Sequence, residues 1–257
     1  IYIMVSRSSG WMHFNTDNIE TLIDAVENGV IDKVHSMIKS GADVNQENND
    51  GETPLFIAAK DGYISIVNKL LIANADMNKS DNEGYTPLLM ALINGHIDIA
   101  IKLISSNADV EQENNDGETP LFIAAKNGYH SIVNKLLAEN VDVNKSDNEG
   151  YSPLLMASNN GHVKVVRFLI SSNANVNQAS DFLETPLNLA AKRGHINVVS
   201  ELLNANANLH QEDDEGYTPL LRAVYGGHLQ VVRLLADRGA IVETPHNDGM
   251  TPVYIAA

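Results

Sequence analysis

The stretch from Asp50 to Tyr63 reads DGETPLFIAAKDGY, and it decides the fold of this 257-residue chain. Thr53 is a good N-cap for a helix, and Pro54 is a good first helical residue because that position needs no N–H donor. Aliphatic and small residues follow at helical spacing, and Gly62 ends the helix. The stretch therefore predicts a short helix whose alanines allow another helix to approach closely.

A second short helix is predicted from the aliphatic residues between Ile66 and Leu71, which share one helical face. It ends at Asn74, and asparagine is the best substitute for glycine in the left-handed conformation of a helix C′ position. The same residue recurs at Asn107, Asn140, Asn173 and Asn206. Helices this short are unstable alone, so we expect stability to come from stacking of neighbouring units.

The Thr-Pro-Leu triplet recurs at a fixed period of 33 residues. It begins at Thr53, Thr86, Thr119, Thr185 and Thr218, with Ser152-Pro153-Leu154 and Thr251-Pro252-Val253 in the same register. A fixed period of this length is typical of stacked repeat proteins. The pattern resembles the ankyrin repeat from about residue 17 to residue 257. The resemblance implies an all-α ankyrin-repeat solenoid of helix-turn-helix units with β-hairpin fingers, seven to eight repeats in all, with a concave face that binds a protein partner.

The domain organisation follows from the phase of the repeat. Residues 1–16 do not fit it, and residues 17–257 form the repeat array, whose last repeat is truncated at Ala257. We therefore expect the natural protein to continue. Residues 46–60 and 112–126 are identical, so the array grew partly by duplicating a pair of repeats. Duplication counts against an active site, because catalysis needs one asymmetric set of side chains.

Composition excludes several classes of function. Lys plus Arg is 17 and Asp plus Glu is 33, so the net charge is −16, which disfavours binding to nucleic acid or to anionic membranes. No apolar run approaches the roughly 20 residues of a membrane helix. The absence of cysteine excludes disulfides and thiolate metal sites. We expect no cofactor, and the partner is expected to be a protein with basic residues.

The histidines do not predict a metal site. His96, His162, His195 and His228 each follow a glycine between two predicted helices. Consecutive copies stand one repeat apart, about 10 Å, which is too far to share a metal with bonds near 2 Å. We expect them to form structural hydrogen bonds. The usual histidine of the ankyrin Thr-Pro-Leu-His motif is absent. No P-loop, Gly-x-Ser-x-Gly or His-Glu-x-x-His motif is found, so we expect no catalytic residues and no enzyme.

Acidic residues gather just before each repeat's helix pair, in the predicted hairpins. They are Asp50, Asp81, Glu83, Asp116, Asp147, Glu149, Asp181, Asp213, Asp214, Glu215 and Asp248. One interpretation is solubility and turn chemistry. The other is a surface that steers a basic partner.

Two variable positions of the repeat alternate in character. The residue before the Thr-Pro pair is Glu or Tyr in turn, and the end of the first helix carries Lys in the glutamate repeats. The series are Glu52, Tyr85, Glu118, Tyr151, Glu184, Tyr217 and Met250, and Lys60, Ile93, Lys126, Asn159, Lys192 and Tyr225. This predicts a surface with alternating charged and aromatic bands, unless the alternation only reflects the duplication. Tyrosine offers rigid contact area with a polar tip, which suits binding.

Repeat six breaks the hairpin rule. Leu183, preceded by Phe182, stands where the other repeats have glycine. Two large apolar side chains at a hairpin tip either pack on the neighbouring hairpin or anchor a partner. We therefore place the candidate binding region at residues 181–226. The candidate protein-binding residues are Tyr85, Tyr151, Phe182, Leu183, Arg193, Tyr217, Arg222 and Tyr225.

Three functions are compatible with these patterns. The first is a non-catalytic protein-interaction module or scaffold. The second is a targeting array of a larger enzyme or effector, and the third is a structural, self-associating rod. We expect a monomer in an intracellular, cytoplasmic location, because the glycosylation sequons at Asn78 and Asn144 lie in tight loops between repeats.

Overall fold

The computed structural model describes residues 4–7, 10–13 and 19–242, which divide into two compact units, Ile1–Asn115 and Asp116–Ala257. In the described part of the first unit the elements are β1 (Met4–Arg7), β2 (Gly10–His13), α1 (Leu22–Glu27), α2 (Ile31–Lys39), α3 (Pro54–Asp61), α4 (Ile64–Ile72), α5 (Pro87–Ile93) and α6 (Ile97–Ser105). Those of the second are α7 (Pro120–Lys126), α8 (His130–Ala138), α9 (Pro153–Asn159), α10 (Val163–Ser171), α11 (Pro186–Arg193), α12 (Ile196–Asn204), α13 (Pro219–Tyr225) and α14 (Leu229–Asp237).

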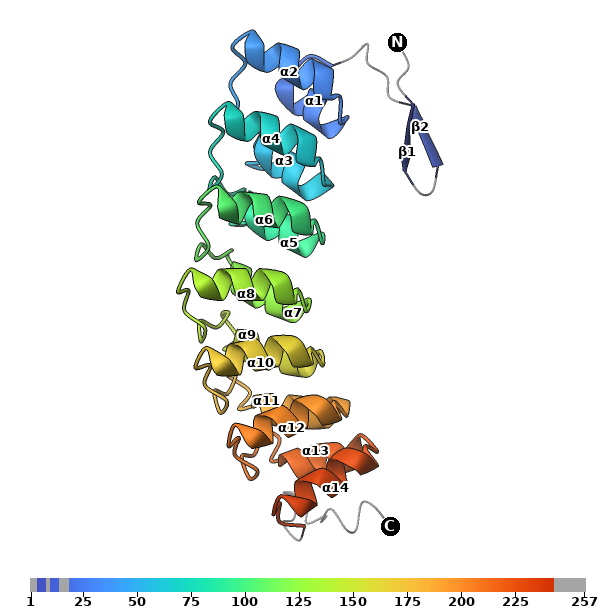
Figure 1. Ribbon diagram of the computed structural model, residues 1–257, viewed down its shortest axis with the longest axis vertical. Helices are drawn as coiled ribbons and strands as arrows, with labels where there is room; N and C mark the ends of the chain where they lie inside the picture. Colours follow the sequence, from blue (N-terminus) through green and yellow to red (C-terminus); the bar gives the residue numbers. More distant parts are fainter. Residues whose placement is uncertain (1–3, 8–9, 14–18, 243–257) are drawn as a thin grey trace. The chain divides into compact units, whose positions relative to one another are not determined.

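Each unit is built of helix pairs stacked in two layers (Figure 1). In the first unit, α1, α3 and α5 pack on one another in order, and α2, α4 and α6 form the second layer. In the second unit, α7, α9, α11 and α13 form one layer and α8, α10, α12 and α14 the other. The described residues thus hold seven helix pairs, which confirms the predicted helical repeat. The truncated repeat that begins at Thr251 lies outside the described residues.

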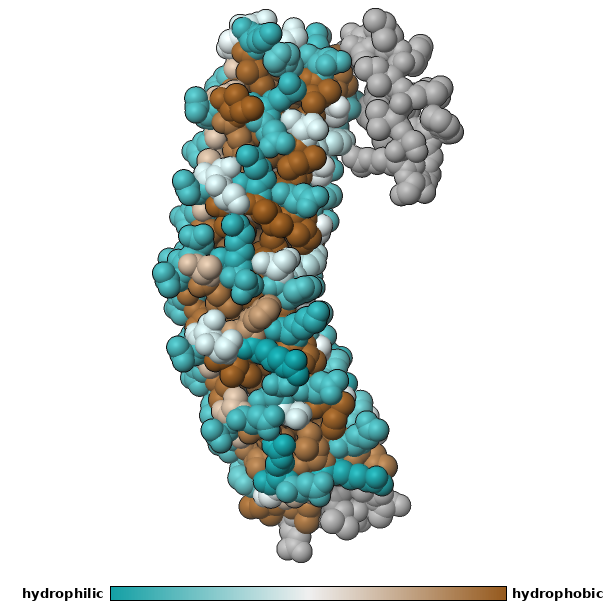
Figure 2. Space-filling model, in the orientation of Figure 1, coloured by the Kyte–Doolittle hydropathy of each residue, from teal (hydrophilic) through white to brown (hydrophobic). Residues whose placement is uncertain are grey.

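The core is largely aliphatic, and Phe56 and Phe122 are its largest fully buried side chains. In α3 the side chains of Leu55, Ala58 and Ala59 are fully buried, and in α4 those of Val67 and Leu70 are fully buried. The alanines let the first helices of successive repeats approach closely. Hydrophobic and hydrophilic side chains alternate over the visible surface of the helix pairs (Figure 2).

The residues at the helix ends act as the sequence predicts. Each Thr or Ser before proline accepts a hydrogen bond from the backbone N–H three residues later, from Thr53 through Thr218. The asparagines after the second helices are left-handed, with φ between 58° and 67°: Asn74, Asn107, Asn140, Asn173 and Asn206. Asparagine thus satisfies the backbone geometry that glycine provides at Gly41 and Gly239.

The predicted β-hairpin fingers are not present as strands in residues 19–242. A tight turn precedes each of the first helices α3, α5, α7, α9, α11 and α13 instead, and its last residue, a glycine in five turns and Leu183 in the other, adopts a positive φ. We call these turns the fingers; they are residues 48–51, 81–84, 114–117, 147–150, 180–183 and 213–216. A backbone hydrogen bond such as Asp147 N to Tyr151 O, at 3.0 Å, closes a finger. The only described strands, β1 and β2, pair antiparallel outside the repeats, and no sequence pattern predicted them.

Histidines connect consecutive repeats through hydrogen bonds. The Nε2 atoms of His162, His195 and His228 lie 2.9 to 3.1 Å from backbone oxygens at the end of the preceding first helix, and His96 does the same in the first unit. Each ring lies against a glycine of the preceding repeat. A Cβ at Gly128, for example, would lie 2.6 Å from the ring of His162. The predicted hydrogen-bonding role of these histidines is confirmed.

The left-handed asparagines give a stability prediction. Replacing Asn140 with glycine should leave the stability unchanged or raise it, whereas Asn140→Val should destabilise by more than about 1 kcal/mol, because β-branched residues tolerate this conformation poorly. Urea unfolding of the two variants measures the difference. Equal stabilities for the valine and glycine variants would contradict the assignment.

Candidate functional site

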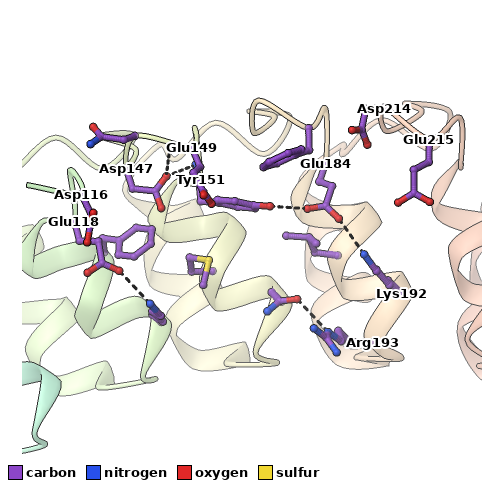
Figure 3. Close-up of a pocket in the computed structure, with 17 residues that line it drawn as sticks. Asp116, Glu118, Asp147, Glu149, Tyr151, Glu184, Lys192, Arg193, Asp214 and Glu215 are labelled. Atoms are coloured by element: carbon purple, nitrogen blue, oxygen red, sulfur yellow. Dashed lines mark hydrogen bonds and ion pairs between the residues drawn. The ribbon is translucent and has the colours of Figure 1, made fainter.

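A groove of about 840 Å³ opens on the second unit, between the fingers and the first helices (Figure 3). Its helical walls come from α7, α9 and α11, and none of its lining residues belongs to a second helix. The lining comprises Asp116, Glu118, Phe122, Lys126, Asp147, Asn148, Glu149, Tyr151, Met156, Asn159, Phe182, Glu184, Leu189, Lys192, Arg193, Asp214 and Glu215. Seven carboxylates therefore face three basic side chains around an aromatic and aliphatic floor.

The carboxylate that begins a finger has a structural role. Asp147 Oδ1 accepts hydrogen bonds from the backbone N–H of Glu149 at 3.1 Å and of Tyr151 at 2.8 Å. Burial raises the pKa of Asp147, and these two hydrogen bonds oppose the shift. Asp81 and Asp213 make the same type of bond in their own fingers. Some of the predicted acids therefore stabilise the turns of the fingers, as the first of the two interpretations expects.

The acids at the finger tips lie at the surface of the unit. Asp116, Glu149, Asp181, Asp214 and Glu215 are all exposed. Adjacent fingers are joined by backbone hydrogen bonds, from Asp181 N to Glu149 O and from Asp214 N to Phe182 O, both 3.0 Å. The fingers therefore present their carboxylates side by side along the rim of the groove.

Tyr151 joins two repeats across the groove. Its hydroxyl donates to Glu184 Oε2 at 3.0 Å, and Glu184 Oε1 accepts from Lys192 Nζ at 3.1 Å (Figure 3). Burial raises the pKa of Tyr151 to about 12, and the bond to the Glu184 carboxylate adds to the shift. The predicted aromatic and charged bands therefore exist but are linked, because the tyrosine of one repeat bonds the glutamate of the next.

Two of the three basic side chains in the groove are neutralised within their own repeats. Lys126 lies 3.0 Å from Glu118, and Lys192 pairs with Glu184; Lys60 and Glu52 form the corresponding pair in the first unit. Within the described residues Arg193 makes no ion pair, and its Nε donates to Asn159 Oδ1 at 3.2 Å. The rim of the groove is therefore acidic, whereas its uncompensated positive charge lies at the far end of α11.

The irregular finger of repeat six adds an aromatic residue to the rim. Phe182 is 43% exposed, and its ring centroid lies 6.2 Å from that of Tyr151. Leu183, which is 49% exposed, replaces the finger glycine at a φ of 56°. This left-handed conformation costs a branched residue about 1 to 2 kcal/mol. Phe182 thus packs on a residue of the neighbouring repeat and still presents nearly half of its surface to solvent.

The other predicted residues form a separate cluster. Arg222 lies over the ring of Tyr217, 4.2 Å from its centroid, and Tyr217 meets Tyr225 edge to face at 5.0 Å. Arg222 Nε donates to the buried Asp213 at 2.6 Å, and its guanidinium also pairs with Glu215. The groove therefore contains Tyr151, Phe182 and Arg193, whereas Tyr217, Arg222 and Tyr225 pack together beside it. Leu183 does not line the groove, and Tyr85 belongs to the first unit.

Sequence reasoning missed one polar residue of the second unit and the floor of the groove. Asn188 replaces the apolar residue of the other repeats, is buried, and donates from Nδ2 to Tyr217 O at 3.0 Å in the next repeat. Its polarity at a core position was the available signal. Met156 and Leu189 line the floor. Their place in the helical period makes them look like ordinary core residues, so no sequence signal distinguishes them.

These features define the class of the protein as a helical repeat protein with a polar and aromatic groove. A family profile described as "Ankyrin repeats (3 copies)" matches residues 22–114, 101–180 and 187–257. The chain belongs to the ankyrin-repeat family, whose repeats generally mediate protein–protein interaction. The described residues hold seven helix pairs, which is more than the three matches of the family profile. A comparison with the curated proteins finds no match.

The part of the chain that the structure describes contains no group of three or more histidine, aspartate or glutamate side chains arranged to hold a metal ion. Among the same residues, no helix combines the length and the apolar character that crossing a membrane requires.

The buried ion pair of the cluster gives a second stability prediction. Arg222→Met should destabilise by about 3 kcal/mol or more, because it leaves the carboxylate of Asp213 buried without its partner. The matched change Lys192→Met removes a more exposed pair and should cost about 1 kcal/mol or less. Urea unfolding measures both. Equal costs would show that the Arg222 pair is not a buried one.

The pKa of Tyr151 gives a prediction with a definite sign. An unfolded tyrosine ionises near pH 10, whereas Tyr151 in the folded chain keeps its proton up to about 12. The folded state therefore binds the proton more tightly, so this contribution to stability is fully present below pH 10 and is lost between pH 10 and 12.

We expect the destabilisation caused by Tyr151→Phe to be smaller at pH 11 than at pH 8. Urea unfolding of the parent chain and the variant at both pH values measures it, and circular dichroism establishes that both are folded at the start. The same destabilisation at both pH values would contradict the raised pKa.

Proposed function

We propose that the chain is a non-catalytic interaction module that binds an extended segment of a protein partner in the groove of its second unit. The observation that carries the proposal is the combination of exposed aromatic surface at Phe182 with finger carboxylates along the same rim. Rigid aromatic side chains with polar surroundings are the usual anchors of protein interfaces. An extended segment fits because the groove runs across successive repeats.

The charge of the groove supports a partner with basic residues. Seven carboxylates line it, and the whole chain carries a net charge of −16. Such a surface raises the association rate of a cationic partner and repels phosphate backbones. Arg193 lies away from the fingers and would accept an acidic group or a carbonyl of the bound segment. The segment would thus lie with its basic part at the fingers.

We also propose an intracellular, cytoplasmic location. Asn78 and Asn144 both stand in sequons, and their side-chain oxygens accept the backbone N–H groups of Asp109 at 2.8 Å and of Asn175 at 2.7 Å in the next repeat. A glycan on either side-chain amide would crowd this junction between repeats. Both side chains are instead used to hold neighbouring repeats together.

The test begins with short random peptides displayed on phage and selected on the intact chain. We expect selected peptides to bind the parent chain, and Phe182→Ala to weaken binding by about 30-fold or more, chiefly through faster dissociation, if Phe182 is an anchor. Lys135→Ala on α8, which does not line the groove, is the matched control and should bind like the parent. Titration calorimetry measures both.

A second readout addresses the role of charge. Asp214→Asn should slow association and weaken its dependence on salt, with little effect on dissociation.

Peptides that bind the Phe182→Ala chain normally but lose binding to the Lys135→Ala chain would place the site on the opposite layer of helices and refute the proposal. Failure to select any peptide would refute it as well.

A further inference from the structure

One position of the fingers breaks the charge pattern of the array. The third residue of each finger is acidic in five of the six described fingers and aromatic in the other. In order these residues are Asp50, Glu83, Asp116, Glu149, Phe182 and Glu215. The duplicated repeats copy their acids, so Phe182 marks one place along an otherwise uniform row. A uniform acidic row attracts a basic partner but does not fix its position along the row. A single aromatic residue in the row can fix that position.

The backbone contacts fix the neighbours of this residue. The finger of repeat six donates from Asp181 N to Glu149 O on one side, and Phe182 O accepts from Asp214 N on the other. The carboxylates of Glu149 and Asp214 line the same groove as Phe182. Neither carboxylate forms an ion pair with another described residue, and the hydrogen bonds that Glu149 and Asp214 make to the neighbouring residues use their backbone N–H and C=O groups. Phe182 thus stands between two carboxylates that have no counter-ion in this part of the chain.

The aromatic surface at this point is formed by two rings. Tyr151 lies 6.2 Å from Phe182, centroid to centroid, with an interplanar angle of 33°. The Tyr151 hydroxyl is held by Glu184, whose charge is in turn balanced by Lys192. The tyrosine ring is therefore fixed in place before any partner arrives. The exposed surface of Phe182 completes an aromatic shelf between Glu149 and Asp214, and we call these four residues the shelf site.

We propose that the shelf site binds one arginine side chain of the partner segment; this inference rests on the proposed function. A guanidinium group stacks on aromatic faces and is attracted by the ring quadrupole. Its five N–H donors also reach carboxylates in bidentate geometry. Lysine offers a compact charge without the planar stacking surface, so arginine fits an aromatic shelf with carboxylates at its edges better. The rest of the acidic rim would attract further basic residues without selecting among them.

The experiment uses the peptides selected on the intact chain. We expect them to share one arginine at a fixed position. The tightest peptide is then synthesised with that arginine, with lysine and with citrulline, which keeps the shape and loses the charge. Citrulline should weaken binding by at least 10-fold, and lysine by a smaller factor. Calorimetry with the parent chain measures all three affinities.

Replacement of Phe182 separates an aromatic site from simple charge attraction. Phe182→Glu restores the acid that Glu149 and Glu215 have, so attraction by charge alone would strengthen binding of the arginine peptide. The shelf site predicts weaker binding, by about 2- to 30-fold from the usual strength of a cation–π contact. Phe182→Leu keeps an apolar side chain of similar bulk and should also weaken binding, whereas Phe182→Trp should retain it. Equal circular dichroism spectra establish that the variants are folded.

The outcomes distinguish the two proposals. Unchanged or tighter binding to the Phe182→Glu chain, or selected peptides with no shared arginine, would overturn the shelf site. If those peptides still lose binding to the Phe182→Ala chain, the groove remains the binding site and the proposed function stands. If no selected peptide depends on Phe182 at all, both proposals fail.

Discussion

The structure depends on one constraint. The backbone groups that have no hydrogen-bond partner within a repeat must find one in the next repeat. A helix of two turns leaves several backbone groups without partners, and it cannot bury its apolar face alone. Here a histidine ring bonds the last carbonyl of the preceding first helix, and a backbone N–H of each finger bonds the preceding finger. Neighbouring repeats within a unit are therefore held in one register by both layers of contact.

That register is also what builds the groove. Because each finger is bonded to its neighbour, the side chains at equivalent positions line up as rows, and any change in one repeat appears at a defined place in its row. The duplicated segments supply identical parts, such as the Glu52–Lys60 and Glu118–Lys126 pairs. Phe182 supplies the asymmetry that recognition of a particular partner needs. Tyr151 connects this aromatic surface to an ion pair, because its ring packs beside Phe182 and its hydroxyl donates to Glu184 of the Glu184–Lys192 pair.

The sequence was sufficient for the fold, because the Thr-Pro-Leu period and the left-handed asparagines are local signals. The residues that line the groove were predicted only in part. Phe182 was found because it violates a turn rule, whereas the engagement of Arg222 by Asp213 and Glu215 depends on how a finger folds back on its own helix. The hydrogen bonds between fingers join backbone atoms, so no residue type in the sequence indicates them. The strands predicted for the fingers are absent among the described repeats because the first helix begins three residues after each finger ends, which leaves no room for a ladder.

The most direct test of this account is amide hydrogen exchange at the second residue of each finger in the native chain. Asp181 and Asp214 are exposed to solvent, yet their N–H groups donate to the preceding finger. If neighbouring repeats hold one another in register, these amides should exchange far more slowly than in an unfolded chain, together with the helices beside them. Exchange at the unfolded-chain rate, while the helices stay protected, would show that the fingers are not joined and would contradict the account.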